Sequence, residues 1–168
     1  MTQDAFRVQS LWSKVPGYNC FGCAPHNESG LALNFIESES EVSAFFNLPP
    51  RYSSYPGVAH CGIIAAVLEE VMGNTLVIKA KRLCFTRKLS LRYIEPVLIG
   101  MNYRASARIA THDGDYYELE AGIYDEADNL MVSAKSGYKA ISPEQASKTM
   151  NVDGPTTAEF LSYLRRDD

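Results

Sequence analysis

One long apolar segment without proline constrains this chain more than any other feature. Residues 61–79 are too long for a strand, so the sequence predicts a helix there. The segments that follow it, 82–97, 102–112, 116–126 and 130–141, have period-two patterns that are typical of strands. Because an antiparallel sheet must cover its apolar face, we predict an α+β fold in which the sheet wraps around the helix.

Two further strands are expected before the helix. Residues 31–38 and 41–49 are alternating or apolar runs with a tight connection, and this pattern predicts a hairpin. The segment 17–30 is rich in Gly, Pro and Asn, so we expect a loop there, and a second loop over 50–57.

The expected organisation is one main domain with two short extensions. Residues 1–16 form an N-terminal extension with a helix over 4–15, and residues 17–142 form the main domain. Residues 143–168 are expected to be a polar tail with a short helix over 156–166. A chain of 168 residues is long enough for one domain with a substantial core.

Charge and hydropathy argue against two classes of partner. The formal net charge is −4, which does not favour a surface that follows nucleic-acid phosphates. No apolar run is expected to approach the roughly 20 residues that a membrane-spanning helix needs, so no membrane partner is expected. The first residues lack the basic and then apolar layout of a signal peptide, and we therefore expect a cytoplasmic protein.

The four cysteines do not predict a disulfide framework in the absence of a secretion signal. They are Cys20, Cys23, Cys61 and Cys84. In the stretch "NCFGCAPH", Cys20, Cys23 and His26 have the spacing of part of a zinc site, which His60 and Cys61 could in principle complete. A turn with two packed thiols is the favoured interpretation, and no metal is predicted.

The predicted helix carries two adjacent carboxylates among apolar residues. Steps of four along it give Cys61, Ala65, Glu69 and Gly73, a stripe of small residues interrupted by one carboxylate. Glu69 and Glu70 could lie on a solvated edge. If Glu69 is instead desolvated, its pKa is raised and it becomes a candidate general base or nucleophile.

The start of the helix offers a second chemical group. Backbone N–H groups are unpaired at a helix N-terminus and can hold an oxyanion, while His60 could contact a substrate or simply cap its own loop. The Cys61 N–H and Glu69 are eight residues apart, or about 12 Å on one helix. If both act on one carbonyl, the helix start of one subunit must face the helix middle of another, as in a two-fold dimer.

Three stretches of the sequence together resemble a known family. "NCFGCAPHNESGLALNF", "GVAHCGIIAAVLEEVMG" and "TRKLSLRYIEPV" are similar to the hotdog-fold acyl-CoA thioesterases of the branch with a His-Gly-Gly motif, the PaaI-like and THEM-type enzymes. The resemblance covers residues 17–141. It implies a hotdog fold, an acyl-CoA substrate, no cofactor apart from the coenzyme A of the substrate, and a homodimer or a dimer of dimers.

The resemblance also implies roles for individual residues. Glu69 stands nine positions after the motif histidine, His60, where the family has its catalytic carboxylate. The backbone N–H of Cys61 would polarise the thioester carbonyl, and Thr86 would help to hold the water. Cys61 replaces the first glycine of the motif, whereas Gly62 keeps the second.

Substrate-binding residues are expected on both sides of the helix. Ser54 occupies the loop position six before the motif histidine, where the family often has an amide side chain. Basic residues near the helix end and the next strand could bind coenzyme A phosphates or form an ordinary solvated edge. They are Lys79, Lys81, Arg82, Arg87 and Lys88.

Two other functions and one other mechanism compete with thioester hydrolysis by a carboxylate. A hotdog hydratase or dehydratase shares the fold, but its histidine followed by a Phe-Pro-rich loop has no counterpart in this sequence. A non-catalytic acyl-CoA-binding or dimerisation module would keep the fold without the chemistry. The Cys61 thiol could itself be a nucleophile, with His60 as the sole neighbouring imidazole to activate it.

Overall fold

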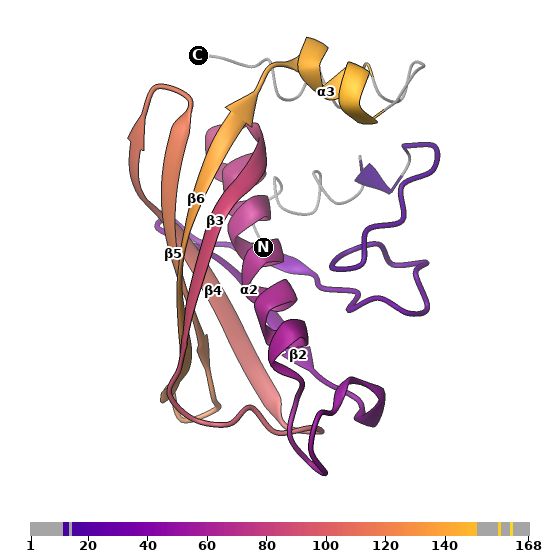
Figure 1. Ribbon diagram of the computed structural model, residues 1–168, viewed down its shortest axis with the longest axis vertical. Helices are drawn as coiled ribbons and strands as arrows, with labels where there is room; N and C mark the ends of the chain where they lie inside the picture. Colours follow the sequence, from indigo (N-terminus) through magenta and orange to yellow (C-terminus); the bar gives the residue numbers. More distant parts are fainter. Residues whose placement is uncertain (1–11, 14, 151–157, 159–161, 163–168) are drawn as a thin grey trace.

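The computed structural model describes residues 12, 13, 15–150, 158 and 162, and its core is one sheet and one long helix. The strands are β1 Phe35–Glu37, β2 Val42–Asn47, β3 Leu83–Tyr93, β4 Asn102–Asp113, β5 Tyr116–Tyr124 and β6 Leu130–Ile141. They form a six-stranded antiparallel sheet in the order β1-β2-β4-β5-β6-β3. The long helix α2, Cys61–Thr75, lies along one face of this curved sheet (Figure 1). The α+β class is confirmed.

The core lies between α2 and the face of the sheet that it covers. Alternate residues of β6 are buried, as expected when one face of a strand meets a helix. The buried apolar side chains of α2 are Ile64, Val67, Leu68, Val71 and Met72. Each apolar side chain of this size stabilises the fold by about 1.5–3 kcal/mol relative to an exposed one, so this helix anchors the sheet.

The helix continues beyond its α-helical part. After Thr75 it becomes a π-helical segment, η2 Leu76–Ala80, and it ends at Lys81, which has a left-handed φ of 54°. The observed segment 61–80 therefore agrees with the helix predicted over 61–79.

This helix corrects one expectation about membranes. The segment Cys61–Ala80 has 20 residues and, by length and composition alone, could cross a bilayer. The expectation that no apolar run approaches that length was therefore wrong. More than half of its most apolar window is buried inside the structure. Its apolar character is accounted for by its packing against the sheet.

The first predicted strand is shorter than expected. The hairpin of β1 and β2 is present, but the chain enters the sheet only at Phe35. The Leu31 N–H donates to the Phe21 carbonyl at 2.7 Å, and the Leu33 N–H donates to the Gly22 carbonyl at 2.9 Å. The segment 31–34 is thus bonded to the preceding loop and not to a strand.

The tail contains a helix that we did not predict. Residues Pro143–Met150 form α3, whereas only a polar tail was expected there. Ser142 and Gln145 make reciprocal side-chain to backbone hydrogen bonds of 3.2 and 3.0 Å, which is the capping-box arrangement. The helices expected over 4–15 and 156–166 lie almost entirely outside the described residues.

The two edges of the sheet differ. At one edge β1 has three residues, whereas at the other edge β3 has 11 residues. In the part of the chain that the structure describes, no strand pairs with the outer side of β3. Phe85 and Tyr93 on this strand are exposed. A long exposed edge of this kind is a template for pairing with another strand.

Candidate active site

The two adjacent carboxylates of α2 are both half-buried, so neither lies on a solvated edge. Glu69 faces β3, where the Thr86 hydroxyl donates a hydrogen bond of 2.5 Å to its Oε1. The Tyr138 hydroxyl donates to the backbone carbonyl of Glu69 at 3.2 Å and so ties the helix to β6. The predicted pair of Glu69 and Thr86 is therefore brought together within one chain.

The surroundings of Glu69 favour its protonated form. Burial is the largest cause that raises the pKa of Glu69, and the neighbouring charge of Glu70 acts in the same direction. The hydrogen bond from Thr86 opposes this and lowers the pKa. A carboxylate with a raised pKa is a stronger base once it is ionised, which suits proton abstraction near neutral pH.

His60 shapes the start of the helix. It is the N-cap of α2, and its Nδ1 accepts a hydrogen bond of 2.9 Å from the Gly62 N–H. A Cβ added at Gly62 would lie 3.1 Å from the same Nδ1, so the glycine leaves room for the capping ring. The backbone N–H of His60 donates to the Tyr52 carbonyl at 2.8 Å. The structure gives His60 a capping role.

Cys61 occupies the first position of the helix with its backbone donor available. Among the described residues, no hydrogen bond is made by the Cys61 N–H. Cys61 is not one of the described residues with positive φ, so replacement of the motif glycine brings no backbone strain. Since Nδ1 of His60 already binds the Gly62 N–H, that nitrogen is not free to activate the Cys61 thiol.

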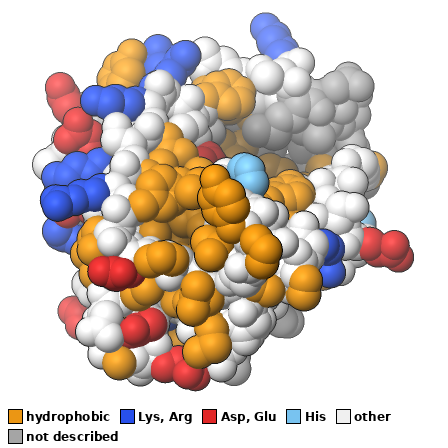
Figure 2. All heavy atoms as spheres, turned by 60° about the horizontal axis from the view of Figure 1, so that its bottom comes forward, with side chains coloured by type: hydrophobic (Ala, Val, Ile, Leu, Met, Phe, Trp, Pro, Cys, Tyr) orange, Lys and Arg blue, Asp and Glu red, His pale blue; other side chains and the backbone are white. Residues whose placement is uncertain are grey.

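A mostly apolar pocket of about 330 Å³ opens beside this helix start. Its walls come from the loop before α2, from α2 itself and from the chain after β3, and they include Ser54, Cys61 and Tyr93. Figure 2, which brings the lower end of Figure 1 forward, shows hydrophobic side chains gathered on this side of the molecule. The volume lies within the range of small-molecule sites.

The two predicted phosphate ligands on β3 are placed differently. The register between β3 and β6 shifts between Thr86 and Lys88, so Arg87 is the additional, unpaired residue of a β-bulge. Thr86 pairs with the buried Tyr138 and faces the helix, whereas Lys88 pairs with Gly137 and faces the opposite side of the sheet. The structure does not bring Lys88 together with Glu69.

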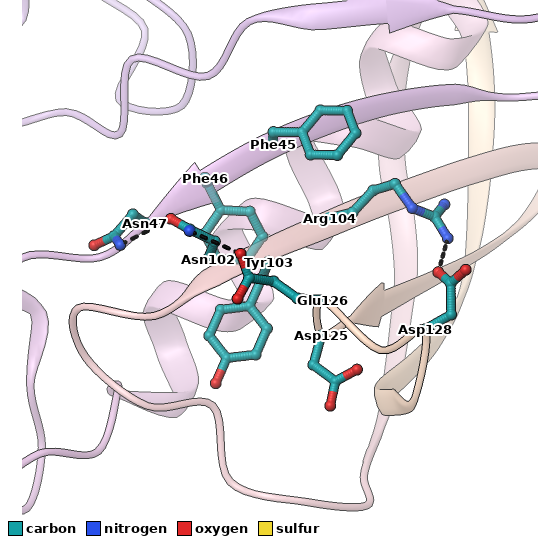
Figure 3. Close-up of a pocket in the computed structure, with 9 residues that line it drawn as sticks. All are labelled: Phe45, Phe46, Asn47, Asn102, Tyr103, Arg104, Asp125, Glu126 and Asp128. Carbon is teal, nitrogen blue, oxygen red and sulfur yellow. Dashed lines mark hydrogen bonds and ion pairs between the residues drawn. The ribbon is translucent and has the colours of Figure 1, made fainter.

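A larger cavity of about 680 Å³ lies elsewhere, at the ends of β2 and β4. It is lined by Phe45, Phe46, Asn47, Asn102, Tyr103, Arg104, Asp125, Glu126 and Asp128 (Figure 3). Arg104 is held by Asp128 at 2.8 Å, and Asn102 donates to Glu126 at 3.0 Å. Its acidic side chains disfavour a phosphate-bearing ligand, and it contains none of the predicted site residues.

Glu70 has surroundings that sequence reasoning missed. It faces the loop that carries Cys20 and Cys23, and the Cys20 thiol lies 3.4 Å from its Oε2. The zinc alternative with His60 and Cys61 is not formed, because the cysteine pair meets Glu70 and not the helix start. The CxxC spacing and the second glutamate were both visible in the sequence, but nothing in it indicated that they meet.

Comparisons with solved structures identify the fold, whereas no protein-family model and no curated protein matches the chain. A thioesterase superfamily protein is 21% identical, with a TM-score of 0.68 over 71% of this chain and 62% of its own length. A thioesterase from Haemophilus influenzae is 17% identical, with a TM-score of 0.65 over 84% of this chain and 92% of its own. A Streptococcus mutans protein bound to acetyl CoA is 14% identical, with a TM-score of 0.61 over 76% of this chain and 96% of its own.

The chain therefore has the hotdog fold of thioesterase-superfamily structures. The predicted resemblance is confirmed at the level of the fold, and membership of the His-Gly-Gly branch stays a prediction. The chain spans about 62% of the length of the first structure named above.

Proposed function

We propose that this protein hydrolyses an acyl-CoA thioester to a free acid and coenzyme A. The observation that carries the proposal is Glu69, a half-buried carboxylate with a raised pKa that is held by the Thr86 hydroxyl. Among the described residues, the side-chain partner of Glu69 is a hydroxyl group, and no ion pair neutralises its charge. A half-buried carboxylate with a raised pKa is suited to act as a general base or a nucleophile.

The chemistry divides between the start and the middle of the same helix. Glu69 either removes a proton from the attacking water or attacks the thioester carbonyl itself, while Thr86 orients the water. The N–H of Cys61, which makes no hydrogen bond within the described residues, donates a hydrogen bond to the carbonyl oxygen as negative charge develops on it. Gly62 and His60 support this donor by fixing the first turn of the helix.

The separation of these groups requires a second subunit. Eight residues along one helix place the Cys61 N–H and Glu69 about 12 Å apart, which is too far for both to contact one carbonyl. In a two-fold dimer, the helix start of each chain supplies the donor for the carboxylate of the other. The exposed edge of β3, which carries Thr86, is the surface that we propose for this pairing.

The substrate class follows from the pocket and the neighbouring charge. The apolar pocket at the helix start suits an acyl or pantetheine chain, with Ser54 at its wall. Arg87, exposed at the bulge beside Thr86, is the cation that we propose for the coenzyme A phosphates. The acetyl CoA bound to the Streptococcus mutans protein supports this ligand class. We propose no metal and no cofactor other than the coenzyme A of the substrate.

The first experiment follows free coenzyme A with a thiol reagent, across a panel of short, long and aromatic acyl-CoA substrates. Wild type should turn over at least one of them, and Glu69→Gln should lose about 100-fold or more in kcat. Glu118→Gln, which changes an exposed glutamate on β5, is the matched control and should retain activity. No turnover by a folded dimer would support the non-catalytic acyl-CoA-binding module instead.

A further inference from the structure

The loop before the first strand places a pair of thiols against the middle of α2. Cys20, Cys23 and Glu70 each offer one donor atom, and these three atoms lie within 4.8 Å of one another. The Cys20 thiol is 3.5 Å from Oε1 and 3.4 Å from Oε2 of Glu70. Asn74 donates to Oε1 at 2.9 Å and fixes the orientation of the carboxylate. Two thiols and one acid thus meet in a site that the proposed hydrolysis does not use.

The two thiols are not equivalent. Cys20 is half-exposed, and the Gly22 N–H donates to its sulfur at 3.3 Å. Cys23 is 3% exposed, and its sulfur lies 2.7 Å from the Tyr18 hydroxyl. One thiol can therefore meet a small reagent from solvent, whereas the other can react only from inside the protein.

Gly22, one of the two residues between the cysteines, lies directly against the Glu70 carboxylate. A Cβ added at Gly22 would collide with the Glu70 side chain, so a larger residue here would require that carboxylate to move away from the loop. The Leu33 N–H donates to the carbonyl of Gly22 and holds the loop in place. The contact between the thiol pair and the acid is therefore built into the loop.

A metal centre accounts for this cluster less well than thiol chemistry. Structural zinc sites generally have four protein ligands, and the described residues bring three donor atoms together here. His26 is the remaining ligand type on this loop, but its Nε2 lies 2.7 Å from the Tyr18 carbonyl oxygen. It is thus engaged outside the cluster.

We propose that Cys20 and Cys23 form a reversible dithiol–disulfide site. It exchanges with low-molecular-weight disulfides such as glutathione disulfide. Cys20 is the attacking thiol, and Glu70 accepts and returns its proton. The thiolate of Cys20 attacks one sulfur of the reagent, forms a mixed disulfide and releases one thiolate, which takes up the proton that Cys20 had given to Glu70. The ionised Glu70 then takes the proton of Cys23. The Cys23 sulfur displaces the second reagent thiolate from Cys20, and that thiolate is protonated by Glu70.

The two steps balance. Two protein thiols lose two electrons and two protons, and one reagent disulfide gains them to become two thiols.

The pKa shifts of Cys20 and Glu70 agree with the roles assigned to them. A hydrogen bond from Cys23 is the largest cause that lowers the pKa of Cys20, to about 5. Burial, followed by the charge of Cys20, raises the pKa of Glu70 to about 7, where a carboxyl group can both accept and return a proton.

The test incubates the full chain in buffers of graded glutathione to glutathione disulfide ratio, quenches it with acid, alkylates free thiols and maps them by mass spectrometry. In wild type we expect an internal Cys20–Cys23 disulfide that disappears again when reduced glutathione is added. In Cys23→Ser a glutathione adduct should accumulate on Cys20, and in Cys20→Ser the buried Cys23 should stay reduced. In Glu70→Gln the internal disulfide should form about 10-fold more slowly or worse.

Cys61 is the internal control, because it is exposed but has no thiol partner in the described structure. It should therefore gain a glutathione adduct and form no internal disulfide. The proposal is overturned if Cys61 gains its adduct while Cys20 and Cys23 stay reduced in the wild type. It is also overturned if the purified protein carries one equivalent of zinc and the pair reacts only after chelation. Either result is independent of whether the protein hydrolyses acyl-CoA.

Discussion

Glu69 and Glu70 are adjacent in the chain but belong to two different sites. One turns towards the sheet edge and Thr86, and the other turns towards the loop that carries Cys20. Successive residues of a helix point about 100° apart, so neighbouring side chains can serve separate surfaces. Because the charge of Glu70 raises the pKa of Glu69, the two sites are nevertheless coupled electrostatically. A substitution at Glu70 is therefore not a neutral control for Glu69.

Removal of the Thr86 hydroxyl should shift the pH dependence of hydrolysis. Its hydrogen bond lowers the pKa of Glu69, so Thr86→Val should raise that pKa. Since the ionised carboxylate is the active form, the rising limb of kcat/KM should move to higher pH, with a loss of about 10-fold at pH 7. Thr86→Ser keeps a hydroxyl and should retain the wild-type limb. An unchanged limb in Thr86→Val would separate this residue from the chemistry.

Removal of the Cys61 N–H should abolish most of the activity without unfolding the protein. Proline is favoured at the first helical position, and the extended backbone of His60 is compatible with a following proline. Cys61→Pro should therefore keep the wild-type Tm and lose about 100-fold or more in kcat. Cys61→Ala keeps the backbone donor and should remain active. If Cys61→Ala loses activity to the same extent, the thiol and not the N–H is the functional group.

At this scale, the family resemblance pointed to a pair of residues that the structure brings together. It implied roles for Glu69 and Thr86, whose side chains form a hydrogen bond, while the roles themselves stay predictions. The contact of Glu70 with Cys20 joins residues 50 positions apart. Such a contact depends on how a loop without periodicity packs, and hydrophobic patterns do not report this.

Among the elements, β3 contains the most features that the proposed function uses. It supplies Thr86, forms the exposed edge of the sheet and contains the bulge at Arg87. The bulge gives Arg87 an unpaired position and leaves Lys88 on the opposite side of the sheet. Two adjacent cations that look equivalent in sequence therefore have different surroundings.

Arg87→Ala and Lys88→Ala should differ in their effect on substrate binding. If Arg87 contacts the coenzyme A phosphates, Arg87→Ala should raise KM by about 10-fold with kcat nearly unchanged. Lys88→Ala, its matched neighbour, should change KM by less than about 2-fold. A substrate truncated to acyl-pantetheine lacks those phosphates and should abolish the difference. Equal effects of the two substitutions would instead indicate a diffuse electrostatic contribution from the whole edge.

Length and periodicity account for the elements that were predicted and for the one that was missed. The helix at 61–80 was predicted from its length and its lack of proline, and the strands after it were predicted from their 2-residue patterns. Each was found within a few residues. The helix Pro143–Met150 has only one fully buried described side chain, Ala146, so its apolar stripe is weak. The sequence feature that indicates this helix is the capping box of Ser142 and Gln145 at its start. A search for hydrophobic patterns does not detect a capping box.

For the whole molecule, the proposed mechanism would make one chain an incomplete catalyst. The proposed donor and the proposed base lie at separate points of one helix, and no other strand of the described residues pairs with the outer side of the strand beside the base. Pairing of two such edges would extend the sheet across a two-fold axis and bring the helices of two chains together. Shared sites then follow from the assembly.

A mixture of two inactive variants should recover activity if the sites are shared. Cys61→Pro lacks the donor and Glu69→Gln lacks the base, so a hybrid dimer contains one intact site and one site that lacks both groups. After joint unfolding and refolding at equal concentrations, half of the dimers are hybrids, and about a quarter of wild-type activity should return. Each variant refolded alone is the control. Absence of recovery, with hybrid dimers shown by mass spectrometry, would mean that each site lies within one chain.

The position of the helix in the chain also determines when the fold can form during synthesis. The helix ends at Ala80, whereas the last strand that covers it ends at Ile141. At ordinary translation rates the ribosome needs roughly 3 to 12 s to make those remaining residues. During that interval the 20-residue apolar segment has been made, but most of the sheet that buries it has not. We therefore expect chaperones that bind apolar segments to bind the nascent chain. The yield of folded protein in a cell should depend on these chaperones more than the stability of the folded protein suggests.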